Sequence, residues 1–136
     1  MPYVIGVIVS VGVAWFARFV GLDRDRAFYP TVMIVIAAYY VLFAVIDGSV
    51  HTLLLEAAVM TAFVVAAVVG FKANTWIVVG ALAGHGILDA FHARIIDNSG
   101  VPAWWPAWCL AYDLGAAGCL AWLMTRRHRE GGGKIL

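Results

Sequence analysis

Charged residues are scarce in this chain. They make up 12% of its 136 residues, whereas apolar residues make up 64%. Because soluble domains usually contain about 25% charged residues, this composition excludes an ordinary soluble globular protein and is typical of an integral membrane protein. The few basic residues lie between apolar runs rather than along one stripe, so we expect no nucleic-acid partner.

Cysteine is also rare, with only Cys109 and Cys119 in the sequence. Ten residues of one helix would separate them by about 15 Å along its axis, which is too far for a disulfide bond between them. The amino terminus lacks the positively charged segment and the small-residue cleavage site of a signal peptide. We therefore expect the first apolar run to be retained.

Long apolar runs, by contrast, are abundant. Five are long enough to cross a hydrocarbon core of about 30 Å as helices. The sequence predicts these helices at residues 2–20, 29–47, 52–72, 75–96 and 104–124. We expect an all-α bundle of five transmembrane helices in one domain, residues 1–130, followed by a flexible glycine-rich tail, residues 131–136.

The basic residues predict how this bundle lies in the membrane. If five helices alternate in direction, eight basic residues fall on one side: Arg18, Arg24, Arg26, Lys72, Arg126, Arg127, Arg129 and Lys134. Only Arg94 falls on the other side. Because cytoplasmic loops carry the excess of Lys and Arg, we expect the amino terminus outside, the carboxyl terminus in the cytoplasm, and Trp104, Trp105 and Trp108 at the outer interface.

Small residues are spaced for close helix packing. Gly80 and Gly84 form a GxxxG pattern in the fourth apolar run, and Gly115 and Gly118 lie in the fifth. Such faces let helix backbones approach closely. They indicate either tight contacts inside the bundle or a face through which two copies of the chain form a homo-oligomer. Membrane lipids are expected to surround the protein in both cases.

Ionisable residues converge in the half of the bundle away from the basic loops. His85, Asp89 and His92 are spaced i, i+4 and i+7, so they share one face of a helix. Asp113 lies at the depth of His85 on the next helix, and Glu56 lies at the depth of Asp89 on the preceding one. Because ionisable side chains inside a membrane are costly, the set predicts a functional site.

Other side chains are predicted to surround this site. Asp47 and His51 flank the turn between the second and third helices. The expected lining of a funnel that opens outward, and of its substrate site, is Tyr39, Tyr40, Trp105, Cys109 and Tyr112. Residues 23–26 alternate Asp and Arg and are expected to form a solvated loop on the basic side.

The first functional hypothesis is a membrane-embedded enzyme with a divalent metal, zinc or iron, acting on a lipid or isoprenoid. His85, Asp89 and His92 would hold the metal, Asp113 would complete or orient the site, and Glu56 would be the general acid or base. A metal-bound water makes hydrolysis the simplest reaction class.

Three alternatives stay open. Without a metal, Glu56 or Asp113 would deliver a proton to an alkene, as in an isomerase or cyclase of isoprenoids. The same polar funnel would also suit a small transporter of protons or metal ions. Finally, His85 with Asp113, and Glu56 with His51, would be interhelical pairs that only fix helix register in a structural subunit.

Three segments, "FYPTVMIVIAAYYVLFAV", "GHGILDAFH" and "GVPAWWPAWCLAYD", resemble a family of uncharacterised small bacterial integral membrane proteins, which implies the bacterial plasma membrane and no particular activity. The chain also resembles the sterol isomerases of the emopamil-binding-protein type, five-helix proteins that move protons at an alkene. By that resemblance His85 and Asp89 match the His-and-acid pair of one helix, and Trp105 and Asp113 match the Trp and Asp of the last.

Overall fold

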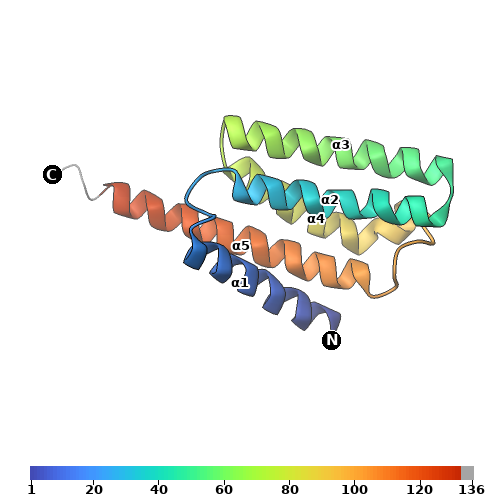
Figure 1. The fold of residues 1–136 in the computed structure, drawn as a ribbon, viewed down its shortest axis with the longest axis horizontal. Helices are drawn as coiled ribbons and strands as arrows, with labels where there is room; N and C mark the ends of the chain where they lie inside the picture. Colours follow the sequence, from blue (N-terminus) through green and yellow to red (C-terminus); the bar gives the residue numbers. More distant parts are fainter. Residues whose placement is uncertain (133–136) are drawn as a thin grey trace.

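The computed structural model describes residues 1–132, and it is all helical over this range (Figure 1). The five helices are α1 (Pro2–Val20), α2 (Phe28–Asp47), α3 (Val50–Lys72), α4 (Trp76–Ile95) and α5 (Trp105–Gly132). Each is long and apolar enough to cross a membrane. The prediction of five membrane-spanning helices is therefore confirmed.

The helix boundaries agree with the prediction to within two residues except at the end of α5. That helix continues from residue 124 through a polar segment to Gly132, and an i, i+4 ion pair between Arg126 and Glu130 supports the extension. The helix thus enters the first two residues of the tail predicted at 131–136. The rest of that tail lies outside the described residues.

Glycines follow the ends of α1 and α2, and a serine caps the start of α3. Gly21 follows α1 with a φ of 89°, and Gly48 follows α2 with a φ of 79°. Both values are left-handed, and glycine adopts them without a steric penalty. Ser49 then caps α3 by accepting a hydrogen bond from the backbone N–H of Thr52.

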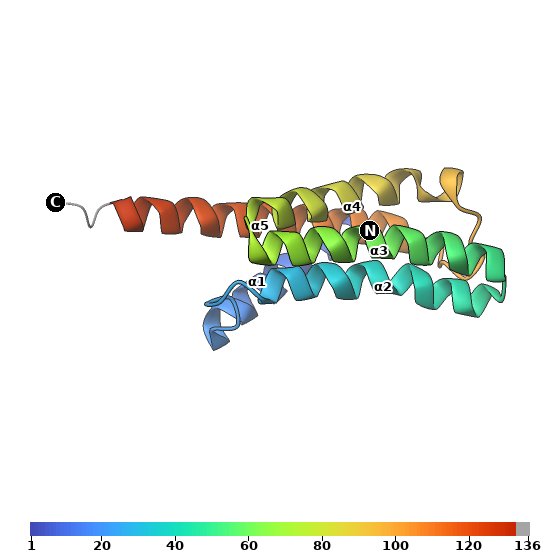
Figure 2. The ribbon, with the colours of Figure 1, turned by 90° about the horizontal axis from the view of Figure 1, so that it is seen from above.

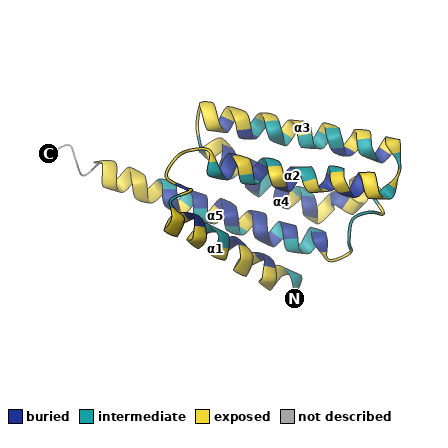
Figure 3. Cartoon of the chain, viewed as in Figure 1, coloured by how far each residue is buried: buried dark blue, intermediate teal, exposed yellow. Residues whose placement is uncertain are grey.

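Consecutive helices α2, α3, α4 and α5 form an antiparallel bundle, and α1 lies outside it against α5 (Figures 1 and 2). The buried side chains lie mainly on the facing sides of α2, α4 and α5, while α1 and α3 turn much of their surface outward (Figure 3). Because lipid solvates apolar surface, such exposed faces suit a membrane protein. Both cysteines are free, as expected.

The basic loops gather at one end of the bundle, as the alternating topology requires. Arg26 lies just before α2. It donates one hydrogen bond to the side chain of Thr75, which precedes α4, and another to the carbonyl of Gly70 in α3. Arg127 of α5 donates to the carbonyl of Asp23. The side of the membrane that this end faces remains a prediction.

One expectation about this end is wrong: Asp23 is not solvated. Its side chain is buried, with Oδ2 lying 3.5 Å from a terminal nitrogen of Arg18. Arg18 of α1 contacts its carboxylate and Arg127 of α5 contacts its carbonyl, so side chains of two helices help to cover a residue whose sequence context is strongly polar.

The glycines divide into two groups. A Cβ on Gly115 would strike Ser10 of α1, so this glycine allows close helix packing as expected. A Cβ on Gly80 or Gly84 would meet no atom within 4 Å. The GxxxG pattern of α4 therefore does not pack inside this bundle, and a homo-oligomer through it remains a prediction.

Candidate functional site

A group of four metal-ligand side chains lies buried between α4 and α5. His85, Asp89, Cys109 and Asp113 each offer one ligand atom, and these atoms all lie within 4.8 Å of one another. All four side chains are buried. We call this group the His85 cluster.

A direct contact between two helices holds the cluster together. His85 Nδ1 lies 2.7 Å from Asp113 Oδ2, which confirms that these residues face each other. The same nitrogen lies 3.6 Å from Asp89 Oδ2, one turn along α4. Cys109, one turn before Asp113, has its sulfur 3.9 Å from Asp113 Oδ2.

Gly86 explains why α4 and α5 can approach so closely at this level. A Cβ at this position would lie 3.1 Å from the Cβ of Asp113 and 3.2 Å from the carbonyl oxygen of Leu110. With hydrogen in place of a side chain, the two backbones approach and the short Asp113 side chain reaches His85.

A second polar group lies between α3, α4 and the loop that follows α4. His92 Nε2 lies 2.7 Å from Glu56 Oε1, and the amide of Asn98 donates a hydrogen bond of 2.9 Å to the same oxygen. His92 and Glu56 are both buried. We call this group the His92 cluster.

Tyr40 of α2 stands between the two clusters. Its hydroxyl donates a 2.6 Å hydrogen bond to Asp89 Oδ1, its ring stacks on that of His92 with centroids 4.1 Å apart, and its carbonyl accepts from Asn98. Its ring centroid also lies 5.9 Å from that of His85. One tyrosine thus orients an acid of the first cluster and the imidazole of the second.

The structure separates residues that the sequence was expected to join. His92 pairs with Glu56, so the group of four that could hold a metal does not include it. Glu56 was expected opposite His51, but His51 is exposed. His85 and His92 are separated because α4 has different neighbours along its length. It contacts α5 at the level of His85 and α3 at the level of His92, and residue spacing within α4 does not predict this change.

The expected lining residues also divide. Cys109 is itself a member of the His85 cluster and Tyr40 contacts the cluster, whereas Tyr112 stacks on Trp108. Tyr39 is 39% exposed and packs on Trp105, which is buried. The expected open funnel is replaced by a covered site, since the cluster residues are at most 2% exposed.

Two contributors were missed by the reading of the sequence. Asn98 lies in "DNSGVP", a segment typical of a loop, yet its side chain reaches Glu56. Phe63 of α3 packs edge-on against His85, with ring centroids 4.8 Å apart. Neither has a motif around it, and the sequence around Asn98 indicates only a loop.

Three buried carboxylate oxygens of the two clusters lack a hydrogen-bond partner among the described residues, namely Glu56 Oε2, Asp89 Oδ2 and Asp113 Oδ1. Such atoms are costly inside a protein. In the His85 cluster, two of them belong to acids that flank one imidazole. The two acids of this cluster could therefore accept further interactions. A bound cation would interact with the free oxygens, and a proton on one of the carboxylates would reduce their negative charge.

Comparison of the chain with protein-family models, with curated proteins and with solved structures finds no match. The functional conclusion must therefore come from the geometry of the two clusters.

Proposed function

We propose that this protein is a membrane-embedded enzyme that holds a divalent metal, zinc or iron, in the His85 cluster and acts on a lipid or isoprenoid substrate. The observation that carries the proposal is the convergence of His85, Asp89, Cys109 and Asp113 within 4.8 Å in the bundle core. In a tetrahedral zinc site, ligands about 2.0–2.3 Å from the ion lie about 3.3–3.8 Å apart. Side-chain movements of about 1 Å would bring the most widely separated of the four atoms to this spacing.

Charge balance supports a divalent ion in this place. Asp89 and Asp113 would supply two negative charges, and a neutral His85 would supply its ring nitrogen. The two charges of the cation would balance those of the aspartates, and a Cys109 thiolate among the ligands would leave one negative charge in excess. In the His92 cluster, by contrast, the one imidazole faces a single carboxylate, that of Glu56. Buried charges are tolerated only when they are matched in this way.

A bound metal would supply Lewis acidity and a water activated near neutral pH, which makes hydrolysis the simplest reaction class. The chain's own residues would position it. Tyr40 orients Asp89 through the 2.6 Å hydrogen bond. Glu56 remains the candidate general acid or base, since its Oε2 is buried without a partner among residues 1–132.

The substrate would reach this site sideways from the bilayer, between α2 and α5. These helices are not among the closely packed pairs of the bundle, and aromatic side chains bridge them. Trp105 packs against Tyr39 and Phe43, with ring centroids 4.9 and 5.0 Å apart. Cys109 lies one turn beyond Trp105 on α5, so a movement of these rings would uncover the cluster.

The test is elemental analysis of the protein purified in detergent without chelators, beside two matched variants. His85→Gln and His92→Gln each remove one buried imidazole that lies 2.7 Å from a carboxylate. We expect about one equivalent of zinc or iron in the wild type and in His92→Gln, and loss of the metal in His85→Gln. A wild type that neither retains nor takes up either metal would overturn the metal proposal.

Activity is tested separately from metal content. The protein is incubated with bacterial lipid extract in vesicles, and products are followed by mass spectrometry. Conversion by the wild type, lost in His85→Gln, supports an enzyme. A metal-loaded wild type that converts no lipid of the extract would contradict the enzymatic part and leave a metal-binding membrane protein.

One observation favours a second candidate, a metal-free isomerase or cyclase of isoprenoids. His85 and Asp113 already share a hydrogen bond of 2.7 Å, and a pair of this kind can pass a proton to and from an alkene. This candidate predicts a metal-free wild type that exchanges deuterium from solvent into an isoprenoid, with the exchange lost in Asp113→Asn.

A further inference from the structure

The helices α1 and α5 touch at one end of α1 and separate toward the other. Near the amino terminus the packing is tight, since a Cβ on Gly6 would lie 2.9 Å from that of Ala111 and one on Gly115 would strike Ser10. Beyond this contact α1 leaves α5 as it approaches the loop before α2 (Figure 2). The space between the diverging helices is therefore not filled by backbone contact.

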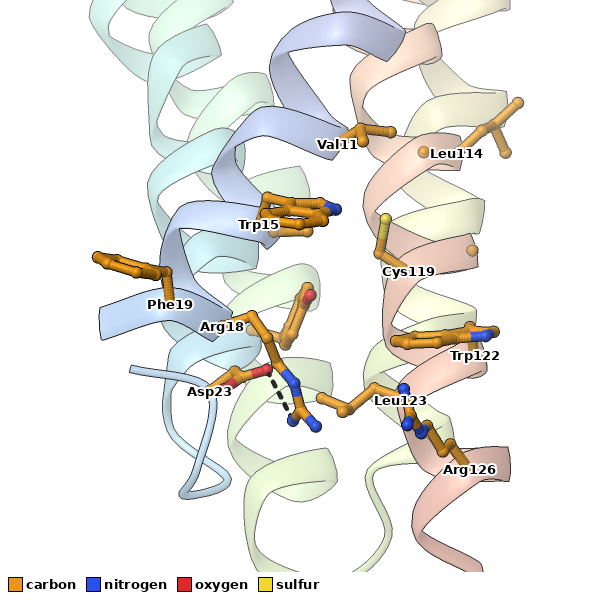
Figure 4. A pocket seen from close by; sticks show the side chains of 14 residues that line it. Val11, Trp15, Arg18, Phe19, Asp23, Leu114, Cys119, Trp122, Leu123 and Arg126 are labelled. Atoms are coloured by element: carbon orange, nitrogen blue, oxygen red, sulfur yellow. Dashed lines mark ion pairs between the residues drawn. The ribbon is translucent and has the colours of Figure 1, made fainter. Parts of the chain in front are cut away.

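A cavity of about 700 Å³ occupies this space. Its walls are large apolar side chains on both helices, namely Val11, Trp15 and Phe19 on α1 and Leu114, Cys119 and Trp122 on α5 (Figure 4). It lies on a different face of α5 from the His85 cluster, because Asp113 is fully buried between helices while Leu114 is exposed. The cavity is thus separate from the site proposed above.

The end of the cavity near the basic loops is charged. Arg18 and Arg126 lie there with Asp23, whose Oδ2 is 3.5 Å from Arg18 (Figure 4). Arg126 also pairs through Nε with the exposed Glu130, a contact of the kind that contributes little at a surface. A smaller cavity of about 360 Å³ continues past Asp23 and Tyr29 and adds Arg26 and Arg127 to the rim. Together the two linings carry four arginines against two aspartates.

The dimensions match one leaflet of a membrane. From Val11 to Phe19, α1 advances by about 12 Å at 1.5 Å per residue, and half of a hydrocarbon core is about 15 Å thick. The apolar part of the cavity therefore spans roughly one leaflet, and the arginines lie where the head groups of that leaflet would be.

We propose that this cavity between α1 and α5 binds an anionic phospholipid, with an acyl chain along Trp15 and Trp122 and its phosphate at Arg18 and Arg126. Arginine pairs well with phosphate oxygens, and clusters of basic residues at a membrane surface select anionic lipids. A zwitterionic lipid has the same chains, but its ammonium group is repelled by the surplus of arginine.

Two glycines provide a matched pair of variants for the test. Gly118 lines the cavity, and Gly12 is an exposed residue of α1 that does not. A Cβ at either position meets no atom within 4 Å. Gly118→Leu therefore fills the cavity without displacing a helix, and Gly12→Leu is its control. Arg126→Gln removes an exposed charge from the rim and leaves the apolar walls unchanged.

The experiment is native mass spectrometry of the full chain, exchanged from detergent into mixed micelles with either phosphatidylglycerol or phosphatidylcholine. We expect one phosphatidylglycerol retained per chain in the wild type and in Gly12→Leu, with at least tenfold less in Gly118→Leu. Phosphatidylcholine should be retained several-fold less, and Arg126→Gln should reduce this preference.

Equal retention of both lipids by the wild type, or full retention of phosphatidylglycerol by Gly118→Leu, would overturn the proposal. A dimer of the wild type that Gly118→Leu dissociates, with no lipid retained by either, would overturn it in favour of a second copy in the cavity. Metal content measured on the same samples separates this test from that of the proposed function, because Gly118→Leu should leave the metal unchanged.

Discussion

The two histidine clusters use the same contact in different surroundings. In each, an imidazole nitrogen lies 2.7 Å from a carboxylate oxygen in the buried core. His92 has one acid, Glu56, which also accepts a hydrogen bond from Asn98. His85 has two acids and a nearby thiol. Each of the three acids keeps one oxygen without a partner among the described residues, so the clusters differ in the number of acids around the imidazole.

Burial of a His–acid pair is therefore not by itself evidence of a catalytic or metal-binding site. One imidazole for one acid is a balanced pair that ties α4 to α3. One imidazole between two acids leaves a negative charge unmatched, and a bound cation or a second proton would balance it.

The largest effect is expected from Asp113→Ala compared with Glu56→Ala. Each removes the acid from a buried pair, and breaking such a pair costs about 3–5 kcal/mol because the remaining group is left uncompensated. We expect both variants to unfold more readily in detergent mixtures, but only Asp113→Ala should lose the metal. Equal metal content in the two variants would remove the distinction between the clusters.

The double variant His85→Leu/Asp113→Leu should be more stable than either single change. Apolar residues in place of a buried pair are often neutral or stabilising by about 1–4 kcal/mol, whereas each single change strands one partner. The measurement is a double-mutant cycle of unfolding free energy with metal analysis at each corner. We expect recovered stability without recovered metal; a metal-loaded double variant would show that the ion lies elsewhere.

Tyr40→Phe sharpens the comparison, because Tyr40 serves both clusters through different atoms. Loss of its hydroxyl leaves Asp89 Oδ1 without the bond seen here and should cost about 1–3 kcal/mol. Loss of a hydrogen bond that orients a metal ligand typically lowers metal affinity about 10–100-fold. The ring stacked on His92 is retained. Competition with a chelator measures the affinity, and unchanged affinity would contradict the orienting role of Tyr40.

The smallest effect is expected at the edge of the proposed substrate entry. Tyr39→Ala removes an aromatic contact with Trp105, worth about 0.5–1.5 kcal/mol, and should let a chelator remove the metal several-fold faster. Tyr3→Ala, at an exposed residue of α1, is the control. Removal at the same rate in both variants would place the entry somewhere other than between α2 and α5.

Much of the fold was predictable because it rests on local pattern. The five apolar runs and the breaks between them gave helices that agree closely with the structure. The shared face of His85, Asp89 and His92 follows from helix periodicity. The level of Asp113 opposite His85 follows from counting residues along two antiparallel helices, and the 2.7 Å contact confirms it.

The sequence did not predict that the residues of this α4 face would contact two different helices. His85 turns to α5 and His92 to α3, because the neighbours of α4 change along its length. The burial of Asp23 was not predictable for a similar reason. A charged loop is expected to be solvated, and only the tertiary structure places Asp23 beside Arg18 next to the cavity between α1 and α5 (Figure 4). Asn98 had no signal beyond a turn-forming context.

The sequence by itself determined that this protein is a bundle of five membrane-spanning helices, with most of its basic residues at one end and His85, Asp89, His92 and Asp113 in the other half. These properties depend on hydropathy and helix period, which are local along the chain. Only the tertiary structure decided which acid meets which histidine and where a cavity opens beside α5. Those outcomes depend on the approach of separate helices, set by residues such as Gly86 and Gly6, and no spacing within one helix contains that information.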